Sequence, residues 1–271
     1  AYRASGINRL SIGIQSFNSG HLEALGRIHD SNEARRAVEI AQANFDNFNL
    51  DLMYALPGQS LAMAERDLER AFALQPTHVS HYQLTLEPNT VFAARPPEGI
   101  PAEDDSWDMQ ERCIEAMAAA GYAQYEVSAY AQAGKQCAHN LNYWRFGDYL
   151  GIGAGAHGKL TMGASEEIRR RWKVKNPRDY LASAGTAKSI GGDDPIAIAQ
   201  RPFDYMLNAL RLVEGFSLKD FEVRTGLSRD AIADRLTVAQ QRGWLELGEA
   251  RVVPTELGKR FTNDVIALFL D

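Results

Sequence analysis

Hydrophobic and polar positions follow two distinct periods along the first half of the chain. Alternating or continuous apolar residues predict strands at 7–17, 47–58, 78–88 and 121–131. Apolar residues spaced three and four apart predict amphipathic helices at 30–45, 61–76 and 104–120. Asp30 is followed three positions later by Glu33, which is the spacing of a helix-capping box. Strands that alternate with helices of this length predict a parallel α/β sheet, either a barrel or an open doubly wound sheet.

The pattern changes after Gly158. Residues 159–177 predict a polar hairpin whose charges lie on a solvated face. Residues 218–258 predict a helix, a glycine turn, a second helix that is capped near Ser228, and a short two-stranded wing. The sequence therefore predicts three parts: a partial (β/α) barrel with its extension at 1–158, a hairpin and linker region at 159–200, and a winged-helix-like domain at 201–271.

A winged helix raises the question of DNA binding, because such domains often place a helix in the major groove. Residues 201–271 contain 10 Lys and Arg but 11 Asp and Glu. The second predicted helix also carries Asp230 and Asp234, whereas contact with phosphates needs positive charge. We therefore expect a docking or capping module and no nucleic-acid partner.

Composition narrows the possible class of protein further. The 271 residues are 45% hydrophobic and 24% charged, which is typical of a globular protein with a sizeable core. The net charge of −6 gives no electrostatic footprint for nucleic acid or for an anionic membrane. Only two cysteines occur, Cys113 and Cys137, so a disulfide scaffold is excluded and a reducing cytoplasm is the expected location.

The segment 153–158, with the sequence GAGAHG, matches the glycine spacing of a dinucleotide-binding fingerprint. That fingerprint needs a helix directly after it to hold a pyrophosphate, and a polar hairpin is predicted there instead. The alternative is that the glycines let the backbone pass close to a ligand or to another strand. We favour this second interpretation.

The segment HNLNYW, at 139–144, contains candidate heme contacts. If it is helical, His139 and Tyr143 lie four residues apart on one face. Imidazole is a common axial ligand of heme iron, and aromatic rings suit a flat macrocycle. The alternative is a histidine that hydrogen-bonds a neighbouring carbonyl beside aromatic core residues, and His157 has the same ambiguity. Cys137 and His139 alone do not make a zinc site, which commonly has three or four protein ligands.

Three polar residues near predicted strands are the other candidates. Gln15 ends the first strand, and Asp51 lies in the middle of an otherwise apolar second strand. Buried polar side chains need partners, and ligands of parallel α/β folds gather at the carboxyl ends of strands. Arg27 follows the first strand closely enough to reach the same rim. Arg27 and Asp51 therefore form either a simple ion pair or a grip on the amino-acid end of a zwitterionic cofactor.

Five blocks, in order and over nearly the whole chain, resemble the HemW family of heme chaperones: GINRLSIGIQSFNSGHLEALGRIHD, NLDLMYALPGQS, SHYQLTLEPNT, CAHNLNYWRFGDYLGIGAGAHG and the winged tail. That family is the sister of the oxygen-independent coproporphyrinogen III oxidase HemN, within the radical S-adenosylmethionine (SAM) superfamily. The resemblance implies the C-terminal part of a six-stranded partial barrel followed by the winged-helix-like domain.

The resemblance also implies roles for particular residues. Gln15, Arg27 and Asp51 match positions that contact SAM in the oxidase branch. The HNLNYW block is associated with heme binding in HemW proteins. It implies a heme region formed by His139, Asn140, Tyr143 and Trp144, with His139 as the ligand of the iron.

The chain departs from the family at its start. The family binds a [4Fe–4S] cluster through a C-x-x-x-C-x-x-C loop, whereas Cys113 and Cys137 lie 24 positions apart and in another region. The first predicted strand corresponds to about the fourth strand of the family barrel. We therefore expect the chain to be roughly the last two-thirds of a HemW-like protein, without cluster ligands and not catalytic alone. We also expect the first strand, 7–17, to present an unpaired edge.

Three functions follow from these patterns. The first is a heme chaperone that passes heme to apo-proteins, and it implies peripheral association with membrane-bound heme proteins. The second is a radical SAM enzyme of porphyrin biosynthesis that decarboxylates coproporphyrinogen III. The third is a non-catalytic α/β scaffold with a docking module. The HNLNYW block favours the first.

Overall fold

A computed structural model describes residues 2–28, 30–163 and 167–270. The chain forms two compact units, Ala1–Gln136 and Cys137–Asp271, and each is described by itself below. The boundaries expected at 158 and 200 both fall inside the second unit, and the three-part division stays a prediction. Within the described residues, none of the helices is both long and apolar enough to cross a bilayer.

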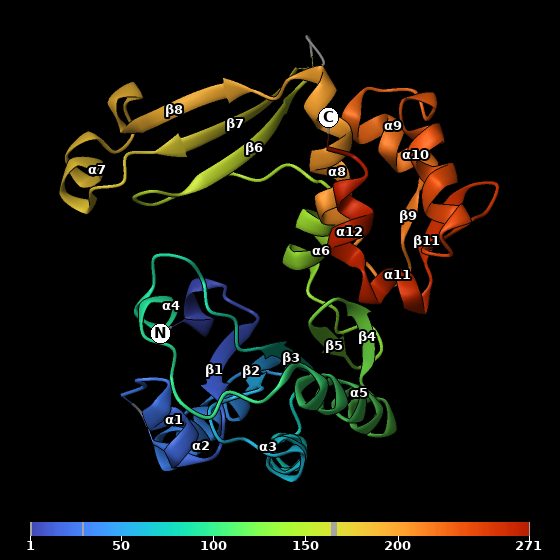
Figure 1. Cartoon of the computed structure of the whole chain (residues 1–271). Coiled ribbons are helices and arrows are strands. Elements are labelled where there is room, and N and C mark those ends of the chain that lie inside the picture. The colour runs from blue at the N-terminus through green and yellow to red at the C-terminus, as the bar shows by residue number, and fades with distance from the viewer. Residues whose placement is uncertain (1, 29, 164–166, 271) are drawn as a thin grey trace. The chain divides into compact units, whose positions relative to one another are not determined.

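The first unit contains a five-stranded sheet with helices packed on one face (Figure 1). Its strands are β1 (Leu10–Gln15), β2 (Phe48–Tyr54), β3 (His78–Gln83), β4 (Ala123–Glu126) and β5 (Ala129–Ala131). Its helices are the 3₁₀ turn η1 (Arg3–Ser5), α1 (Ser19–Ala24), α2 (Ser31–Gln42), α3 (Leu61–Ala73), α4 (Val91–Ala94) and α5 (Glu103–Ala119). The expected alternation of strands and helices is therefore confirmed.

The helix starts follow from local sequence. The Asp30 carboxylate accepts hydrogen bonds from the backbone N–H groups of Asn32 and Glu33, and the Glu33 carboxylate accepts one from the backbone of Asp30. This completes the predicted capping box and satisfies N–H groups that a helix leaves unpaired. The helix that follows, α2, buries Ala34, Val38 and Ala41 against the sheet.

The sheet order is β1-β2-β3-β5-β4, and the first three strands are parallel. Residues from α2, α3 and α5 share one core with Leu50, Leu52 and Val79 of the central strands. Because side chains alternate across a strand, Asn49, Asp51 and Ser80 project from the opposite face. The helices α2, α3 and α5 share the core on one face of the sheet, which agrees with a partial barrel rather than with a doubly wound sheet. Strand β1 pairs with β2 alone in the described part of the chain, so it is an edge of this sheet.

The expected fourth strand is wrong in detail. Residues 121–131 form a hairpin of two short strands, and β5 pairs antiparallel to β3. The Glu126 carboxylate accepts hydrogen bonds from the backbone N–H (3.2 Å) and the hydroxyl (3.4 Å) of Ser128. These bonds stabilise a turn inside an otherwise continuous alternating pattern, and the sheet ends in an antiparallel edge.

The second unit contains two three-stranded antiparallel sheets and a helical core (Figure 1). Its strands are β6 (His157–Met162), β7 (Glu167–Lys173), β8 (Ile190–Pro195), β9 (Phe216–Ser217), β10 (Leu245–Leu247) and β11 (Arg251–Pro254). Its helices are α6 (Ala138–Trp144), α7 (Pro177–Ser183), η2 (Ala187–Ser189), η3 (Ile198–Gln200), α8 (Arg201–Ala209), α9 (Leu218–Thr225), α10 (Asp230–Gln241), α11 (Glu256–Arg260) and α12 (Thr262–Ala267).

The winged-helix expectation is confirmed, with one added strand. Helix α9 ends at Gly226, which has a left-handed φ of 70°. The Ser228 hydroxyl accepts a hydrogen bond from the backbone N–H of Asp230 at the start of α10. The wing, β10 and β11, gains β9 as a third strand.

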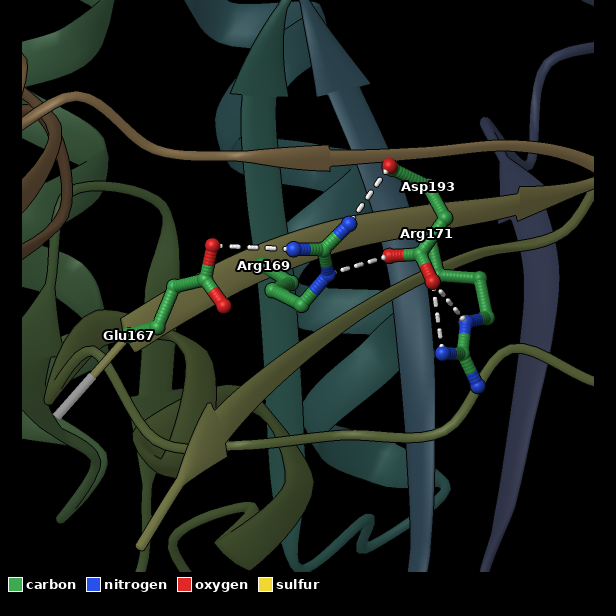
Figure 2. Close-up of polar contacts among 4 residues, drawn as sticks. All are labelled: Glu167, Arg169, Arg171 and Asp193. Carbon is green, nitrogen blue, oxygen red and sulfur yellow. Dashed lines mark hydrogen bonds and ion pairs between the residues drawn. The ribbon is translucent and has the colours of Figure 1, made fainter. Parts of the chain in front are cut away.

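The predicted polar hairpin forms as β6 and β7, and β8 completes its sheet. Figure 2 shows Arg169 between the carboxylates of Glu167 and Asp193, with Arg171 on the other side of Asp193. Hydrogen bonds from Arg171 and Arg169 hold the pKa of Asp193 below its ordinary value. Arg170 differs, because its guanidinium lies 3.0 Å from the buried carboxylate of Asp204. Glu167 and the three arginines of this hairpin therefore form ion pairs instead of projecting singly into solvent.

The glycines of GAGAHG form no phosphate loop. The strand β6 begins at His157, directly after them. A Cβ atom at Gly158 would lie 3.0 Å from the backbone oxygen of Tyr149, whereas Gly153 and Gly155 have positive φ values of 117° and 69° and no neighbouring atom closer than 3.8 Å. The close-approach interpretation is therefore supported at Gly158, and the other two glycines are explained by their backbone conformation.

Candidate functional site

The first candidate site is the polar face of the first unit, opposite the helices. Gln15 ends β1 with a φ of 67°, a left-handed conformation that is uncommon for a residue other than glycine. Its amide oxygen accepts a hydrogen bond of 2.9 Å from the Tyr82 hydroxyl. A Cβ atom at Gly13 would lie 2.9 Å from the Gln15 amide nitrogen. The Gln15 side chain therefore folds back over Gly13.

Asp51 lies beside Gly13, because the two residues are paired in the β1–β2 register. Its carboxylate accepts a hydrogen bond of 3.0 Å from the Ser11 hydroxyl and one of 2.7 Å from the Asn49 amide. Asp51 is half-buried on the face that the helices leave open. A carboxylate has about four acceptor sites, so these two bonds leave capacity for an additional donor.

Tyr82 links the three residues that the sequence singles out. Burial raises the pKa of the Tyr82 phenol, and the Asp51 carboxylate raises it further. The hydrogen bond to Gln15 and the Arg27 guanidinium act in the opposite direction. Asp51 and Arg27 thus both lie within electrostatic reach of this hydroxyl, and Arg27 itself is exposed. The Tyr82 hydroxyl therefore hydrogen-bonds to Gln15, and the charges of Asp51 and Arg27 both affect its pKa.

A buried hydrogen-bond network holds the Asn49 side chain that contacts Asp51. His78 is fully buried, its Nδ1 lies 2.7 Å from the Asn49 amide oxygen, and its Nε2 lies 2.8 Å from the Tyr125 hydroxyl. Ser80 also donates to the Asn49 oxygen, at 3.1 Å. Burial, with a contribution from Arg9, lowers the pKa of His78 to about 3, so the ring is neutral near pH 7. The network fixes the Asn49 amide that donates to Asp51.

Sequence reasoning missed Asn49, His78 and Tyr82. The signal was available, because polar residues at 49 and 51 and at 78, 80 and 82 repeat with the two-residue period of a strand face. Two neighbouring strands with polar residues on the same face indicate a shared polar surface.

The loop that carries Arg27 is anchored by a buried carboxylate. Asp67 of α3 accepts hydrogen bonds from the Ser16 hydroxyl at 2.6 Å and from the backbone N–H of Phe17 at 2.9 Å. Ser16 also lies 3.3 Å from Nδ1 of His21, and Arg70 donates to the Phe17 carbonyl. Burial raises the pKa of Asp67. These contacts attach the end of β1 to the helical layer.

The second candidate site is one face of α6 in the second unit. The HNLNYW segment is helical, as expected, and His139 is exposed. Its ring meets Tyr143 edge-on with centroids 4.8 Å apart, and Tyr143 meets Tyr149 at 4.4 Å. The two tyrosines are half-buried. An accessible imidazole therefore stands at the end of a short row of aromatic rings.

Asn142, rather than Asn140, holds the end of this helix. The Asn142 amide donates a hydrogen bond of 2.9 Å to the carbonyl of Asp148, and the backbone N–H of Gly147 donates to the carbonyl of Asn142. A Cβ atom at Gly147 would lie 2.1 Å from the Asn142 side-chain oxygen. Asp148 in turn binds the buried Lys159 ammonium at 2.8 Å. The segment that leads to Tyr149 is thus fixed to β6.

Trp144 and His157 have different surroundings from His139. Trp144 packs under Arg211, whose guanidinium lies 5.5 Å from its ring centroid. His157 is exposed and stacks on Trp172 with centroids 6.1 Å apart. Of the heme-region residues predicted from sequence, the structure joins His139 to Tyr143 and gives Trp144 a separate contact.

The cysteines do not fit an iron–sulfur cluster. Cys113 is fully buried in α5, and burial raises its pKa to about 12, whereas a cluster ligand is a thiolate. Cys137 is buried in the second unit. Within the described residues, no three His, Cys, Asp or Glu side chains are grouped to hold a metal ion.

Known proteins resemble the chain strongly. A family model described as the HemN C-terminal domain matches residues 199–261. A "Heme chaperone HemW" of Haemophilus influenzae is 47% identical over 270 residues, which cover 99% of this chain and 69% of the relative. Proteins of the same name from Escherichia coli and Bacillus subtilis are 45% and 34% identical, over 99% of this chain and 70% and 71% of their own lengths.

The fold also resembles a solved structure. The radical SAM enzyme coproporphyrinogen III oxidase (HemN) from Escherichia coli matches with a TM-score of 0.77 over 98% of this chain and 65% of its own. At 19% sequence identity, this likeness establishes the fold alone. The α/β architecture with a HemN-type C-terminal domain is therefore that of the radical SAM oxidase, and the sequence identities show that the chain belongs to the HemW family of heme chaperones.

Proposed function

We propose that this chain binds heme and passes it to apo-proteins. The observation that carries the proposal is the 47% identity to a heme chaperone over nearly the whole chain. The oxidase alternative has less support, since the HemN likeness concerns the fold at 19% identity. In this proposal heme is a cargo that has to leave the chain. The side chain that binds the iron must therefore be accessible to solvent instead of enclosed.

The exposed face of α6 suits that requirement. Neutral imidazole binds heme iron, and His139 presents its ring to solvent with Tyr143 and Tyr149 beside it. We assign His139 as the ligand of the iron and Tyr143 as an aromatic contact. Asn140 and Trp144 complete the proposed heme region. The HNLNYW sequence supplies these groups on one short helix.

Transfer of heme tests the function. Purified chain loaded with one equivalent of hemin is mixed with an apo-globin, and the globin Soret band is followed with time. We expect the globin spectrum to appear while the chain returns to its heme-free absorbance. A chain that does not take up hemin, or that retains it in the presence of excess apo-globin, would contradict the proposal.

We further propose that the polar face of the first unit contacts S-adenosylmethionine through Gln15, Arg27 and Asp51. SAM carries an ammonium and a carboxylate, which match the charges of Asp51 and Arg27. A left-handed backbone at a residue other than glycine, as at Gln15, is a feature that occurs at ligand-binding sites. The family to which the chain belongs supports this assignment.

Calorimetric titration with SAM tests this site in the absence of turnover. We expect weak binding that Asp51→Asn reduces further, since the substitution removes a charge without changing shape. Asp46→Asn is the matched control, because Asp46 is exposed in the same unit. Equal binding by the Asp51→Asn variant and the wild-type chain would remove Asp51 from the proposed site.

The residues present give no cluster chemistry to this chain. A [4Fe–4S] cluster supplies the electron for reductive cleavage of SAM in radical SAM enzymes. With two buried cysteines, we expect anaerobic reconstitution with iron and sulfide to yield no stoichiometric cluster. A [4Fe–4S] signal in electron paramagnetic resonance would overturn this expectation. Cytoplasmic location and contact with membrane-bound heme proteins remain part of the proposal.

A further inference from the structure

Positive charge gathers at one end of the β6–β8 sheet, where β7 leads into α7 (Figure 1). Two segments meet there, residues 150–156 before β6 and residues 173–190 from the end of β7 to the start of β8. Together they contain four Lys and Arg side chains and a single acidic one, Asp179. Their net charge is +3, whereas that of the whole chain is −6. The whole-chain charge therefore conceals a basic end of this sheet, which we define as these two segments.

Hydrogen bonds hold the two segments of the basic end together. The backbone N–H of Gly155 donates to the carbonyl of Val174 at 2.9 Å. The backbone N–H of Gly153 donates to the Tyr180 hydroxyl of α7 at 3.1 Å. The turn η2 packs against α7, and its Ser189 carbonyl accepts a hydrogen bond of 3.1 Å from the backbone N–H of Val174. The basic end is therefore one contiguous part of the second unit.

The cations of the basic end have no carboxylate partner. Those that form no ion pair with any residue described by the structure are Lys173, Lys175, Arg178 and Lys188. All of them except the half-buried Lys173 are exposed. The preceding arginines of β7 differ, because Arg169 and Arg171 bind the Asp193 carboxylate (Figure 2). The charge at the end of the sheet is thus available to an external anion.

Aliphatic side chains project beside these charges. Leu181 is 75% exposed and lies three residues after Arg178, on the same face of α7. Ile152 is 84% exposed and directly precedes Gly153, which contacts α7 through Tyr180. Exposed aliphatic residues among cations are typical of surfaces that lie on the headgroup layer of a membrane.

We propose that the basic end is a docking surface for an anionic phospholipid membrane. Lipid phosphates pair with Lys175, Arg178 and Lys188, and the aliphatic side chains of Ile152 and Leu181 enter the boundary between headgroups and acyl chains. A nucleic acid also presents phosphates, but it offers no apolar layer to two exposed aliphatic side chains. The surface contains none of the residues assigned to heme or to SAM, so the inference goes beyond the proposed function.

Co-sedimentation of the heme-free chain with lipid vesicles tests the inference. At about 0.1 M salt we expect binding to vesicles of phosphatidylglycerol mixed with phosphatidylcholine, and no binding to vesicles of phosphatidylcholine alone. Lys175→Gln combined with Arg178→Gln should lower the partition coefficient about 30-fold, as two charges at an anionic surface predict. About 1 M salt should weaken wild-type binding similarly, because it screens exposed charges.

The aliphatic contact has its own variant. Leu181→Ser should lower the partition coefficient about tenfold at either salt concentration, because burial of a leucine side chain is lost. The matched control combines Arg35→Gln with Arg36→Gln, which removes two exposed cations from α2 in the first unit. We expect this control to bind as the wild-type chain does, with circular dichroism as the check that all variants are folded.

Three outcomes would overturn the inference. The first is sedimentation of the wild-type chain with neither kind of vesicle, or equally with both. The second is an equal loss of binding in the control and in the Lys175→Gln, Arg178→Gln variant, which would show that the attraction does not depend on the basic end. The third is binding of duplex DNA in place of the vesicles. Because the test contains no heme, its result leaves the proposed heme transfer to be judged separately.

Discussion

The histidines that the structure describes have opposite surroundings in the two units. In the first unit His21, His78 and His81 are at most 5% exposed, and each lies among core residues or hydrogen-bond partners. In the second unit His139 and His157 are exposed; His139 meets the ring of Tyr143 edge-on, and His157 stacks on the ring of Trp172. The same side chain therefore serves as structure in one unit and is available to a ligand in the other.

This difference separates two kinds of polar surface. The polar face of the first unit is prearranged by buried hydrogen bonds, so its geometry depends on the fold. The α6 face of the second unit has an accessible ligand, so its chemistry can be removed without removing the fold. Changes at buried histidines should act on stability, and changes at exposed ones should act on binding.

The largest expected effect is the loss of stability of the first unit in acid. Burial lowers the pKa of both His78 and His81 to about 3, whereas an unfolded histidine titrates near 6.5. The folded state keeps these rings neutral while the unfolded chain takes up protons as the pH falls below 6.5. Stability is therefore complete above pH 6.5 and is lost progressively down to about pH 3. Two such groups lower the free energy of unfolding by about 2–4 kcal/mol between pH 7 and pH 5.

Urea unfolding followed by circular dichroism at pH 7 and pH 5 measures this loss. The lowered pKa of His21 acts in the same direction, because the unfolded chain binds that proton more readily than the folded one. The raised pKa of Asp67 acts in the opposite direction, because the folded state binds that proton first, but only near the lower end of the range. Unchanged unfolding midpoints would show that these histidines are not buried as neutral rings.

His78→Ala should be nearly as damaging. The substitution removes a fully buried ring and its two hydrogen bonds, one with Asn49 and one with Tyr125. A cavity and two lost hydrogen bonds predict a loss of about 3 kcal/mol in the free energy of unfolding. His157→Ala is the control, and it should change stability by about 0.5 kcal/mol or less. Similar losses for both variants would remove the distinction between the units.

A smaller effect is expected at the end of α6. Gly147→Ala places a methyl group on the Asn142 side chain, which must move away from the Asp148 carbonyl. Overpacking of this kind costs about 1–3 kcal/mol. We expect a lower thermal midpoint together with weaker hemin binding, although His139 itself is unchanged. Gly163→Ala has open space around its Cβ position and is the control. A Gly147→Ala variant with wild-type stability would show that the Asn142 contact is dispensable.

The sequence predicts the local order of this fold better than its long-range contacts. The capping box at Asp30, the parallel strands and the helical HNLNYW segment follow from spacing within a few residues. The β4–β5 hairpin does not, because its turn depends on one carboxylate inside a continuous alternating pattern. The strand β8 was also missed, since its sequence IGGDDP has little strand propensity and forms by pairing with β7.

In the candidate sites, too, single residues could be predicted from local sequence, but their long-range contacts could not. Gln15, Arg27 and Asp51 could be chosen from their positions in strands and loops, and His139 from its motif. Tyr82 could not be joined to them without the register of three strands. The basic end of the β6–β8 sheet joins two segments that sequence spacing does not bring together.

The most direct test of the account is a hemin titration of two folded variants, His139→Ala and His157→Ala, with circular dichroism as the check on folding. Both residues are exposed in the second unit, so neither substitution should unfold it. If His139 binds the iron, His139→Ala should weaken hemin binding and shift or broaden the Soret band, while His157→Ala retains the wild-type spectrum and affinity. Equal spectra and affinities for the His139→Ala variant and the wild-type chain would contradict the assignment of His139 and leave the HNLNYW segment a structural element.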